Sequence, residues 1–265
     1  MDFKTLVIGS GGEKGFIYLG VLSVLWKTLS NVDRLCGSSV GSAILFLYSL
    51  GYDTEEVKEI AIGLQLVPSW RYLSLKRWGL FSNDHIRMCL EKSSKRKYNV
   101  DLTFIDHWRL TGYELVVCVF NVTTGVNEYI SYKTHPNMSV SYCVTMSCTI
   151  PFVFSLMEYN DCLYGDGAIG DCLPLIDNET CMSIHVRTIT TSPFWNIIYG
   201  PLNSYRSLKL KTSGYNIEII DRTPMSREEM YEVSYCYYQT KQYNKAIDGF
   251  KQLSGKQDSL SQHAM

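Results

Sequence analysis

The chain opens with a stretch in which a strand pattern turns into a helical pattern through a run of glycines. Residues 6–25 read LVIGSGGEKGFIYLGVLSVL and contain five glycines. Residues 6–8 have the apolar, β-branched character of a short buried strand, and apolar residues recur at helical spacing from Phe16 to Leu29. A strand that leads through a tight turn into a helix begins a βαβ unit, so the sequence predicts an α/β fold.

A glycine-rich loop before a helix binds anions, and its spacing indicates which anion. A P-loop requires a lysine and a hydroxyl residue after its last glycine, whereas here Lys14 precedes Gly15 and Phe16 follows it. A dinucleotide-binding fold requires an acidic residue at the end of the second strand, and CGSSVG, residues 36–41, stands there instead. The same amides can stabilise an oxyanion, and we expect this use of the loop.

The second informative stretch is GSSVG, from Gly37 to Gly41, which matches the G-x-S-x-G pattern of a nucleophile turn. It lies between a predicted strand at residues 34–36 and a predicted helix at residues 41–50. In this context a serine is held on a sharp turn with its hydroxyl exposed, and small neighbours let the turn close. Ser39 is therefore the candidate nucleophile, with the positive end of the following helix directed at the anion that forms on attack.

A serine nucleophile requires a base, and the third stretch, YGDGAIGDCLP, offers one. Asp166 lies between Gly165 and Gly167 at the end of a predicted strand. Glycines let the backbone approach closely and leave the carboxylate few polar neighbours, a setting that raises an aspartate pKa toward that of a working base. The five histidines of the chain have no motif of their own.

The rest of the chain predicts further alternating elements. Asp53 and Glu56 form a capping-box pattern before a helix in TEEVKEIAIGL. The other predicted elements are a helix at 84–91, a hairpin in YELVVCVFNVTTGVNEYISY, a helix in SVSYCVTMSCTI, a hairpin-like pair at 152–164, a strand in CMSIHVRTI and a terminal helix in REEMYEVSYCYYQTKQYNKAIDGFKQL. Beyond about residue 190 the pattern weakens, and the last ten residues are expected to be disordered.

Composition narrows the classes of function. The 25 Lys and Arg balance 26 Asp and Glu, so we expect no nucleic-acid partner. The nine cysteines form no C-x-x-C pair, which argues against a zinc ribbon and against a disulfide scaffold. No apolar run reaches the roughly 20 residues of a spanning helix, and residues 1–9 lack a basic signal-peptide start. We expect a cytoplasmic protein whose membrane contact is peripheral.

Together, the three stretches resemble the patatin-like phospholipases, which are Ser-Asp dyad lipid acyl hydrolases, over about residues 5–190. SGGEKG at residues 10–15 is similar to the family's glycine-rich oxyanion loop, GSSVG to its nucleophile turn and DGA at 166–168 to its Asp-Gly-Gly/Ala motif. SCTIPFVF, from Ser147, resembles the family's Ser-x-x-x-Pro segment upstream of the aspartate.

The resemblance implies a three-layer α/β/α sandwich with a mixed, mainly parallel central sheet. It implies a catalytic domain at residues 1–190 and a partly helical C-terminal extension at residues 191–265. Ser39 would be the nucleophile and Asp166 the general base in hydrolysis of fatty-acyl esters of glycerolipids and phospholipids, with no metal or cofactor. The resemblance also implies an oxyanion hole formed by the backbone of Gly11, Gly12, Lys14 and Gly15. The residues that would support the two motifs are Gly37, Gly41, Gly167 and Ala168.

Two other interpretations stay open. Ser39, Asp166 and His185 follow the chain order of an α/β-hydrolase triad, although that fold lays down several strands before its nucleophile and only one precedes Ser39 here. A catalytically silent lipid-binding module would keep the fold without the reaction.

Two stretches have the composition of surfaces that contact lipid. Residues 68–82, PSWRYLSLKRWGLFS, combine aromatic and basic residues as interfacial segments do, and the same composition fits a loop that packs on the core. KSSKRK, residues 92–97, could meet anionic lipid, but a solvated helix end is favoured. The expected substrate is a membrane phospholipid or another acyl lipid.

Overall fold

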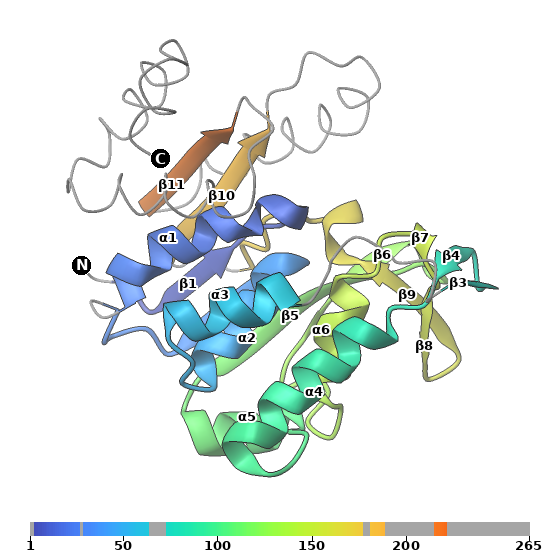
Figure 1. Ribbon diagram of the computed structural model, residues 1–265, viewed down its shortest axis with the longest axis horizontal. Helices are drawn as coiled ribbons and strands as arrows, with labels where there is room; N and C mark the ends of the chain where they lie inside the picture. The colour runs from blue at the N-terminus through green and yellow to red at the C-terminus, as the bar shows by residue number, and fades with distance from the viewer. Residues whose placement is uncertain (1–2, 27–28, 64–72, 177–180, 189–214, 222–265) are drawn as a thin grey trace.

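The structure is a computed structural model in which helices flank a mixed central sheet (Figure 1). It describes residues 3–26, 29–63, 73–176, 181–188 and 215–221. The central sheet has the strand order β11-β10-β1-β2-β5-β9-β8, and β6 also pairs with β5. Its strands are β1 (Thr5–Ile8), β2 (Arg34–Ser38), β5 (Glu114–Asn121), β6 (Val126–Ile130), β8 (Met157–Tyr159), β9 (Cys162–Asp166), β10 (Cys181–Thr188) and β11 (Tyr215–Asp221).

The direction of the strands agrees with the sequence-based fold class. The pairs β10–β11, β1–β10, β1–β2 and β2–β5 are parallel, whereas β5–β6, β5–β9 and β8–β9 are antiparallel. The flanking helices are α1 (Phe16–Leu25), α2 (Val40–Ser49), α3 (Thr54–Gly63), α4 (Asp84–Tyr98), α5 (Phe104–Thr111) and α6 (Val140–Ser147). The mixed, mainly parallel α/β sandwich is therefore confirmed.

Parallel pairing brings the two glycine-rich turns to one edge of the sheet. In the register of β1 with β2, Thr5 lies opposite Arg34 and Ile8 opposite Gly37. The two strands therefore end together, β1 in the loop that leads to α1 and β2 in the turn that leads to α2. Ligand-binding loops gather at this carboxyl edge in open α/β sheets.

The core lies between the sheet and the helices. Four fully buried side chains belong to one hydrophobic cluster: Tyr18 and Leu22 of α1, Phe46 of α2 and Ile8 of β1. Because α1 and α2 are apolar around most of their circumference, they are central rather than surface helices. The two helices that follow the glycine-rich turns are thus fixed by burial of apolar area.

Several local expectations are confirmed. The capping box forms as predicted, since the Glu56 amide donates to the Asp53 carboxylate at 2.9 Å and the Asp53 amide donates to the Glu56 carboxylate at 3.1 Å. The hairpin of residues 113–132 is the antiparallel β5–β6 pair. His185 lies in β10, the strand expected in CMSIHVRTI.

Other elements differ from expectation. The helix predicted at 84–91 continues to Tyr98, because the basic run extends it and places Lys95, Arg96 and Lys97 at the negative end of its dipole. The helix α5, with the side chain of Thr103 as its N-cap, was not predicted. Nor was β11, which lies after residue 190 and pairs with β10. The terminal helix and the disordered last residues expected from the sequence lie outside the described residues.

Three short strands form a second sheet at one side of the molecule. They are β3 (Leu73–Lys76), β4 (Gly79–Phe81) and β7 (Phe152–Phe154), in the order β3-β4-β7. Figure 1 shows them at the right, beyond β9. Part of the aromatic and basic stretch at 68–82 is thereby placed in a small sheet, and residues 68–72 lie outside the described residues.

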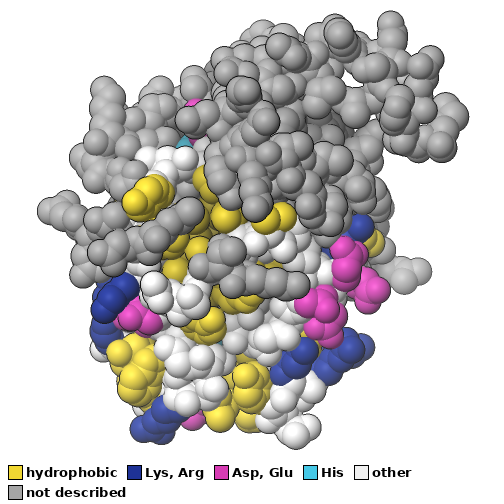
Figure 2. All heavy atoms as spheres, turned by 90° about the vertical axis from the view of Figure 1, so that its left-hand side faces the viewer, with side chains coloured by type: hydrophobic (Ala, Val, Ile, Leu, Met, Phe, Trp, Pro, Cys, Tyr) yellow, Lys and Arg dark blue, Asp and Glu magenta, His cyan; other side chains and the backbone are white. Residues whose placement is uncertain are grey.

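The surface carries charges of both signs. Figure 2 looks at the left-hand side of Figure 1, where Lys and Arg side chains lie close to Asp and Glu side chains. Within the described residues, eight cysteines are free thiols. No described helix has the length and apolar character needed to cross a bilayer.

A buried histidine makes the stability of this fold depend on pH. His107 of α5 is 0% exposed and its Nε2 lies 2.7 Å from the Ser49 hydroxyl at the end of α2. Burial lowers the pKa of His107 from 6.5 to about 4, so the folded protein holds it neutral while the unfolded chain takes up a proton. Holding His107 neutral therefore costs no stability above pH 6.5, and the free energy of unfolding decreases as the pH falls from 6.5 toward 4. At about pH 5 this decrease amounts to about 2 kcal/mol.

The variant His107→Gln keeps a hydrogen-bonding group and takes up no proton in this range. Urea unfolding at about pH 7.5 and about pH 5 should therefore show a smaller loss of stability on acidification than in the wild type. Equal losses in the two proteins would contradict the assignment.

Candidate active site

The turn between β2 and α2 forces Ser39 into a strained conformation. Its φ of 53° and ψ of −132° lie outside the regions that non-glycine residues favour. The Ser39 carbonyl accepts hydrogen bonds from the Ser42 amide at 2.9 Å and the Ser42 hydroxyl at 2.6 Å, which close the first turn of α2. The serine therefore stands at the N-terminal end of a helix, on a sharp strand-to-helix turn as the sequence predicted.

Ser39 and Asp166 are directly hydrogen-bonded. The Ser39 hydroxyl donates to Asp166 Oδ2 at 2.7 Å, and the two residues are 7% and 5% exposed. The bond is direct, so no imidazole stands between the two side chains. His185 is 0% exposed in β10, where its Nε2 lies 3.4 Å from Glu218 Oε1 of β11. Of the alternative triad, the structure brings Ser39 and Asp166 together but leaves His185 apart from them. His185 lies in β10, which is separated from β2, the strand before Ser39, by β1.

The strand β5 sets the distance between the two residues. Cys118 lies opposite Ser38 at the end of β2, and the next residue, Val119, lies opposite Asp166 at the end of β9. The other edge of β5 is occupied by β6 from Val117 to Asn121. β2 and β9 therefore share one edge of β5 and approach it end to end. Ser39 and Asp166 meet where these two strands meet.

The junction of β2, β5 and β9 leaves no room for a side chain at Gly167. A Cβ at this position would overlap the Cys118 carbonyl and would lie 3.0 Å from the Ser38 hydroxyl. Gly167 begins the short 3-10 turn η4 (Gly167–Ile169), in which the Ala168 amide donates to Asp166 Oδ1 at 2.8 Å. One carboxylate oxygen is thus held by the backbone, and the other faces Ser39.

Burial makes Asp166 a base of moderate strength. Desolvation raises its pKa from 3.8 to about 6, and the hydrogen bonds from the Ala168 amide and the Ser39 hydroxyl oppose this rise. The expectation of a raised pKa rested on the two flanking glycines. In the structure the larger cause is exclusion of water, since the carboxylate is enclosed by the packed ends of three strands and α6.

The end of α6 holds both members of the pair. The Ser147 hydroxyl accepts from the Ser39 amide at 2.8 Å and donates to the Cys118 carbonyl at 2.6 Å. Two residues later, the Thr149 carbonyl accepts from the Asp166 amide at 2.7 Å. The thiol of Cys148 between them contacts the Ser39 hydroxyl, and burial raises the pKa of this thiol. Ser147 belongs to the expected Ser-x-x-x-Pro segment, but its contact with Ser39 spans 108 residues and has no local signal.

The glycine-rich loop is anchored to the sheet on one side. The Gly9 amide donates to the Ile184 carbonyl at 2.9 Å, and the Ser10 amide donates to the Cys172 carbonyl at 2.8 Å. The Tyr18 hydroxyl donates to the Ser10 carbonyl at 2.9 Å and accepts from the Val186 amide at 3.1 Å. These bonds tie the loop to β10 and α1 and keep its path fixed.

Among the amides expected to form the anion site, that of Lys14 already donates a hydrogen bond within the loop. Gly12 has a φ of +55° and begins the 3-10 turn η1 (Gly12–Gly15). Within this turn the Lys14 amide donates to the Gly11 carbonyl at 3.0 Å. The amides of Gly11 and Gly12 precede that bond, and no partner for them is found within the described residues.

The loop packs directly against the start of α2. A Cβ at Gly41 would lie 2.5 Å from the Ile8 carbonyl oxygen, so only glycine lets α2 approach the end of β1 this closely. At Gly15 a Cβ would lie 2.5 Å from Val40 Cγ2, which shows that the end of η1 touches the residue after Ser39. Gly37 lies within β2, two residues before the serine. The two predicted turns are therefore neighbours in space.

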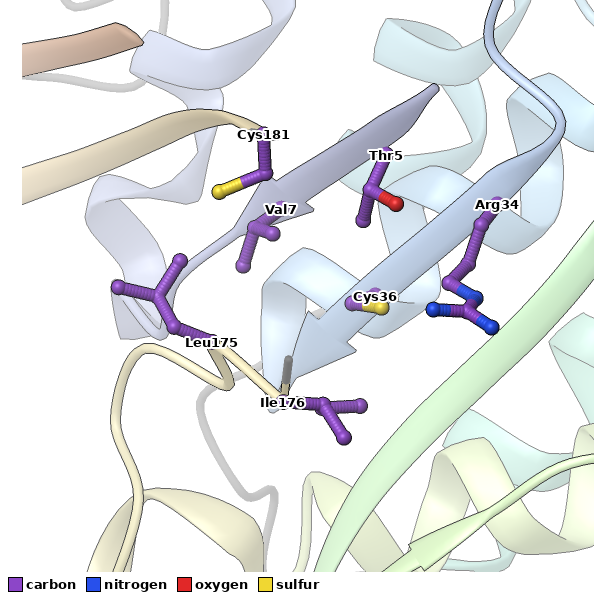
Figure 3. A pocket seen from close by; sticks show the side chains of 7 residues that line it. All are labelled: Thr5, Val7, Arg34, Cys36, Leu175, Ile176 and Cys181. Carbon is purple, nitrogen blue, oxygen red and sulfur yellow. The ribbon is translucent and has the colours of Figure 1, made fainter. Parts of the chain in front are cut away.

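Two hollows occur in the described structure away from this site. One of about 10 Å³, the size of a single water, is lined by Thr5, Val7, Arg34, Cys36, Leu175, Ile176 and Cys181 (Figure 3). A larger one of about 400 Å³ lies at the opposite end of the strands, beside Arg34, Trp108 and Glu114. Neither is lined by Ser39 or Asp166. In the described part of the chain, no group of His, Cys, Asp and Glu side chains is arranged to hold a metal ion.

The raised pKa of Asp166 implies a testable stability penalty. Ionising a group whose folded pKa is about 6 and whose unfolded pKa is 3.8 destabilises the fold by about 3 kcal/mol above pH 6. Asp166→Asn keeps an oxygen acceptor and removes the charge, so its free energy of unfolding should exceed that of the wild type by about 1–3 kcal/mol at about pH 8. The excess should shrink as the pH falls from 6 toward 4. A variant that is less stable than the wild type at both pH values would contradict the buried-charge account.

The family model of the patatin-like phospholipases matches residues 6–177. Among curated relatives, the probable lipid hydrolase 463L of Invertebrate iridescent virus 6 is 28% identical over 233 residues, which cover 84% of this chain and 79% of that protein. The lysophospholipase NTE1 of Candida glabrata is 26% identical over 178 residues, which cover 65% of this chain and 9% of that protein.

Solved structures share the fold. The crystal structure of VipD from Legionella pneumophila has a TM-score of 0.60 and 16% identity, and the match covers 94% of this chain and 67% of that one. The type III effector protein ExoU, of Pseudomonas aeruginosa, has a TM-score of 0.53 and 13% identity, with coverage of 96% and 53%. The family match includes the glycine-rich loop, the Ser39 turn and the Asp166 motif in one continuous segment, and the chain therefore belongs to the patatin-like phospholipase family.

Proposed function

We propose that the protein is a lipid acyl hydrolase of the phospholipase A type, which cleaves fatty-acyl esters of glycerophospholipids through Ser39 and Asp166. The observation that carries the proposal is the direct 2.7 Å bond from the Ser39 hydroxyl to a buried carboxylate. Membership of the patatin-like phospholipase family supports lipid hydrolysis, as do relatives named as a lipid hydrolase and a lysophospholipase.

In the first half of the reaction, Asp166 Oδ2 takes the proton of the Ser39 hydroxyl while Ser39 Oγ attacks the ester carbonyl carbon. The carbonyl electron pair moves to its oxygen and forms an oxyanion. The amides of Gly11 and Gly12 and the N-terminal end of α2 are the proposed groups that stabilise this charge. Because the Lys14 amide donates to Gly11 in the structure, it would join the hole only if η1 opened.

In the second half, the tetrahedral intermediate collapses and Asp166 gives its proton to the leaving alcohol oxygen, which releases the lysolipid. The acyl group stays on Ser39 Oγ. Water then attacks the acyl-enzyme as Asp166 takes a water proton, and the fatty acid departs when Ser39 Oγ regains a proton from Asp166. One carboxylate thus serves as base and acid in turn, without an imidazole.

The pKa of Asp166 sets the pH dependence. Only the ionised carboxylate accepts the serine proton, so kcat/KM should rise through about pH 6 and fall about tenfold per unit below it. The profile is measured with a soluble short-chain ester, so that lipid ionisation plays no part. A midpoint near pH 7 that disappears in His185→Gln would point to a histidine base instead.

The residues themselves are tested by substitution. Ser39→Ala and Asp166→Asn should each lower fatty-acid release from phospholipid vesicles by about 10³-fold or more, because each removes a group that takes part in every turnover. His185→Gln should stay within a few fold of the wild type, since its side chain lies against β11. Circular dichroism and urea unfolding confirm that each variant is folded.

Three outcomes separate the interpretations. Loss in Ser39→Ala and Asp166→Asn alone supports the dyad. Loss in folded His185→Gln as well would contradict the dyad in favour of a triad. A folded wild type without activity on vesicles or on the soluble ester would contradict the enzymatic proposal and favour a silent lipid-binding module.

Ser147 provides a further test of the geometry. Ser147→Ala leaves the amide of the strained Ser39 without its acceptor, so kcat on the soluble ester should fall by about 10- to 100-fold with little change in KM. Ser147→Thr keeps a hydroxyl and should recover most of the loss.

Ser141→Ala is the matched control for that measurement. Ser141 is a fully buried serine of the same helix, and its hydroxyl donates to Asp101 Oδ1 at 2.7 Å instead of touching the dyad. It should lose stability to a similar extent and keep kcat. Equal losses of kcat in the two alanine variants would show a general effect of the helix rather than a positioning effect on Ser39.

A further inference from the structure

The small sheet carries a set of large apolar side chains that face solvent. Trp78 is 75% exposed and Phe152 is 73% exposed. Trp78 and Phe152 together are called the aromatic face, and the nearby Leu73, Leu80 and Ile150 are 46–50% exposed. Exposed apolar residues scattered singly need no explanation, but two large aromatic side chains exposed on hydrogen-bonded neighbours form a candidate surface for contact with another apolar phase.

The members of the aromatic face are held next to one another by backbone bonds. The Phe152 amide donates to the Trp78 carbonyl at 3.0 Å, and Phe152 lies opposite Gly79 in the β4–β7 pair. Both aromatic residues have positive φ, 61° at Trp78 and 67° at Phe152. Bulky residues rarely adopt this conformation, and here they gain no burial from it.

The aromatic face is continuous with the scaffold of the dyad. The Thr149 carbonyl binds the Asp166 amide, and the next three residues run directly to the exposed Phe152. A Cβ at Gly165, the residue before Asp166, would lie 3.4 Å from Pro151 Cγ. The segment from Ser147 to Phe152 therefore starts at the nucleophile and ends in the aromatic face.

An ion pair lies beside the aromatic face. Arg77, which precedes Trp78 in the β3–β4 turn, bonds Glu158 of β8 at 2.5 Å, and both side chains are about half exposed. A surface with one paired cation and anion beside Trp and Phe side chains complements a headgroup layer that carries both signs.

From this combination we propose that the aromatic face docks the protein on the surface of a zwitterionic phospholipid bilayer, with Trp78 and Phe152 inserted at the level of the headgroups. The inference rests on the proposed lipid acyl hydrolase function, which supplies the reason for a bilayer beside the dyad. Tryptophan beside a basic residue suits this depth, because the ring is apolar and both groups keep polar atoms in the wet layer. Docking would bring the bilayer to the segment that holds Ser39 and Asp166.

The test combines binding and turnover in a variant that leaves the backbone intact. Asparagine tolerates positive φ, so the double variant Trp78→Asn/Phe152→Asn removes both rings without new strain. In the Ser39→Ala background, its affinity for phosphatidylcholine vesicles should fall by about tenfold or more in a flotation assay. With Ser39 intact, hydrolysis of vesicle lipid should fall similarly, while kcat/KM on a soluble short-chain ester should stay unchanged.

A matched double control is available elsewhere on the surface. Leu110 of α5 is 55% exposed and Val126 of β6 is 54% exposed, so Leu110→Gln/Val126→Thr removes comparable apolar exposure away from the aromatic face. This control should bind vesicles as the parent does. Equal binding of the aromatic-face variant and its parent would overturn the proposal. Binding that needs anionic lipid and vanishes at about 0.5 M salt would also overturn it, in favour of an electrostatic surface.

The design separates this proposal from the proposed function. If the wild type binds phosphatidylcholine through the aromatic face but hydrolyses neither vesicles nor the soluble ester, the docking surface stands and the hydrolase function fails. If the soluble ester is hydrolysed and vesicles are not bound, the hydrolase function stands and the docking proposal fails.

Discussion

The register of β5 is the constraint on which the site depends. Consecutive residues of this strand, Cys118 and Val119, pair with the ends of β2 and β9, so two strands from distant parts of the chain meet end to end. A shift of one residue in either pairing would turn each side chain to the other face of the sheet and separate Ser39 from Asp166. Gly167 protects this junction, because any side chain there would overlap the Cys118 carbonyl.

A second consequence of the junction is electrostatic. The same packing that brings the carboxylate to Ser39 removes it from water and raises its pKa to about 6, so that it is ionised at neutral pH at a cost in stability. Ser147 and Thr149, at and just after the end of α6, hold both residues in place by accepting hydrogen bonds from their amides. The site is therefore less stable than an apolar junction would be, and this is the expected relation between stability and function.

Much of the fold and of the candidate site could be predicted from local patterns. The glycine-rich loop, the Ser39 turn and the Asp166 turn each follow a strand, and each can be recognised because only small residues allow the backbones to approach. α5 was missed because it has only eight residues and a short apolar pattern. β11 was missed because its pairing with β10 is a long-range contact across residues 189–214, without a turn signal. The roles of Ser147 and Thr149 depend on contacts with residues far away in the chain, which no window of sequence contains.

The central claim, that buried Asp166 activates Ser39 without a histidine, is tested most directly by covalent labelling of Ser39 with an activated fluorophosphonate, followed by mass spectrometry as a function of pH. The account predicts a single label on Ser39, a labelling rate that rises through about pH 6, strong slowing in Asp166→Asn and an unchanged rate in His185→Gln. Labelling that is equally fast in Asp166→Asn, or that is lost in folded His185→Gln, would contradict it.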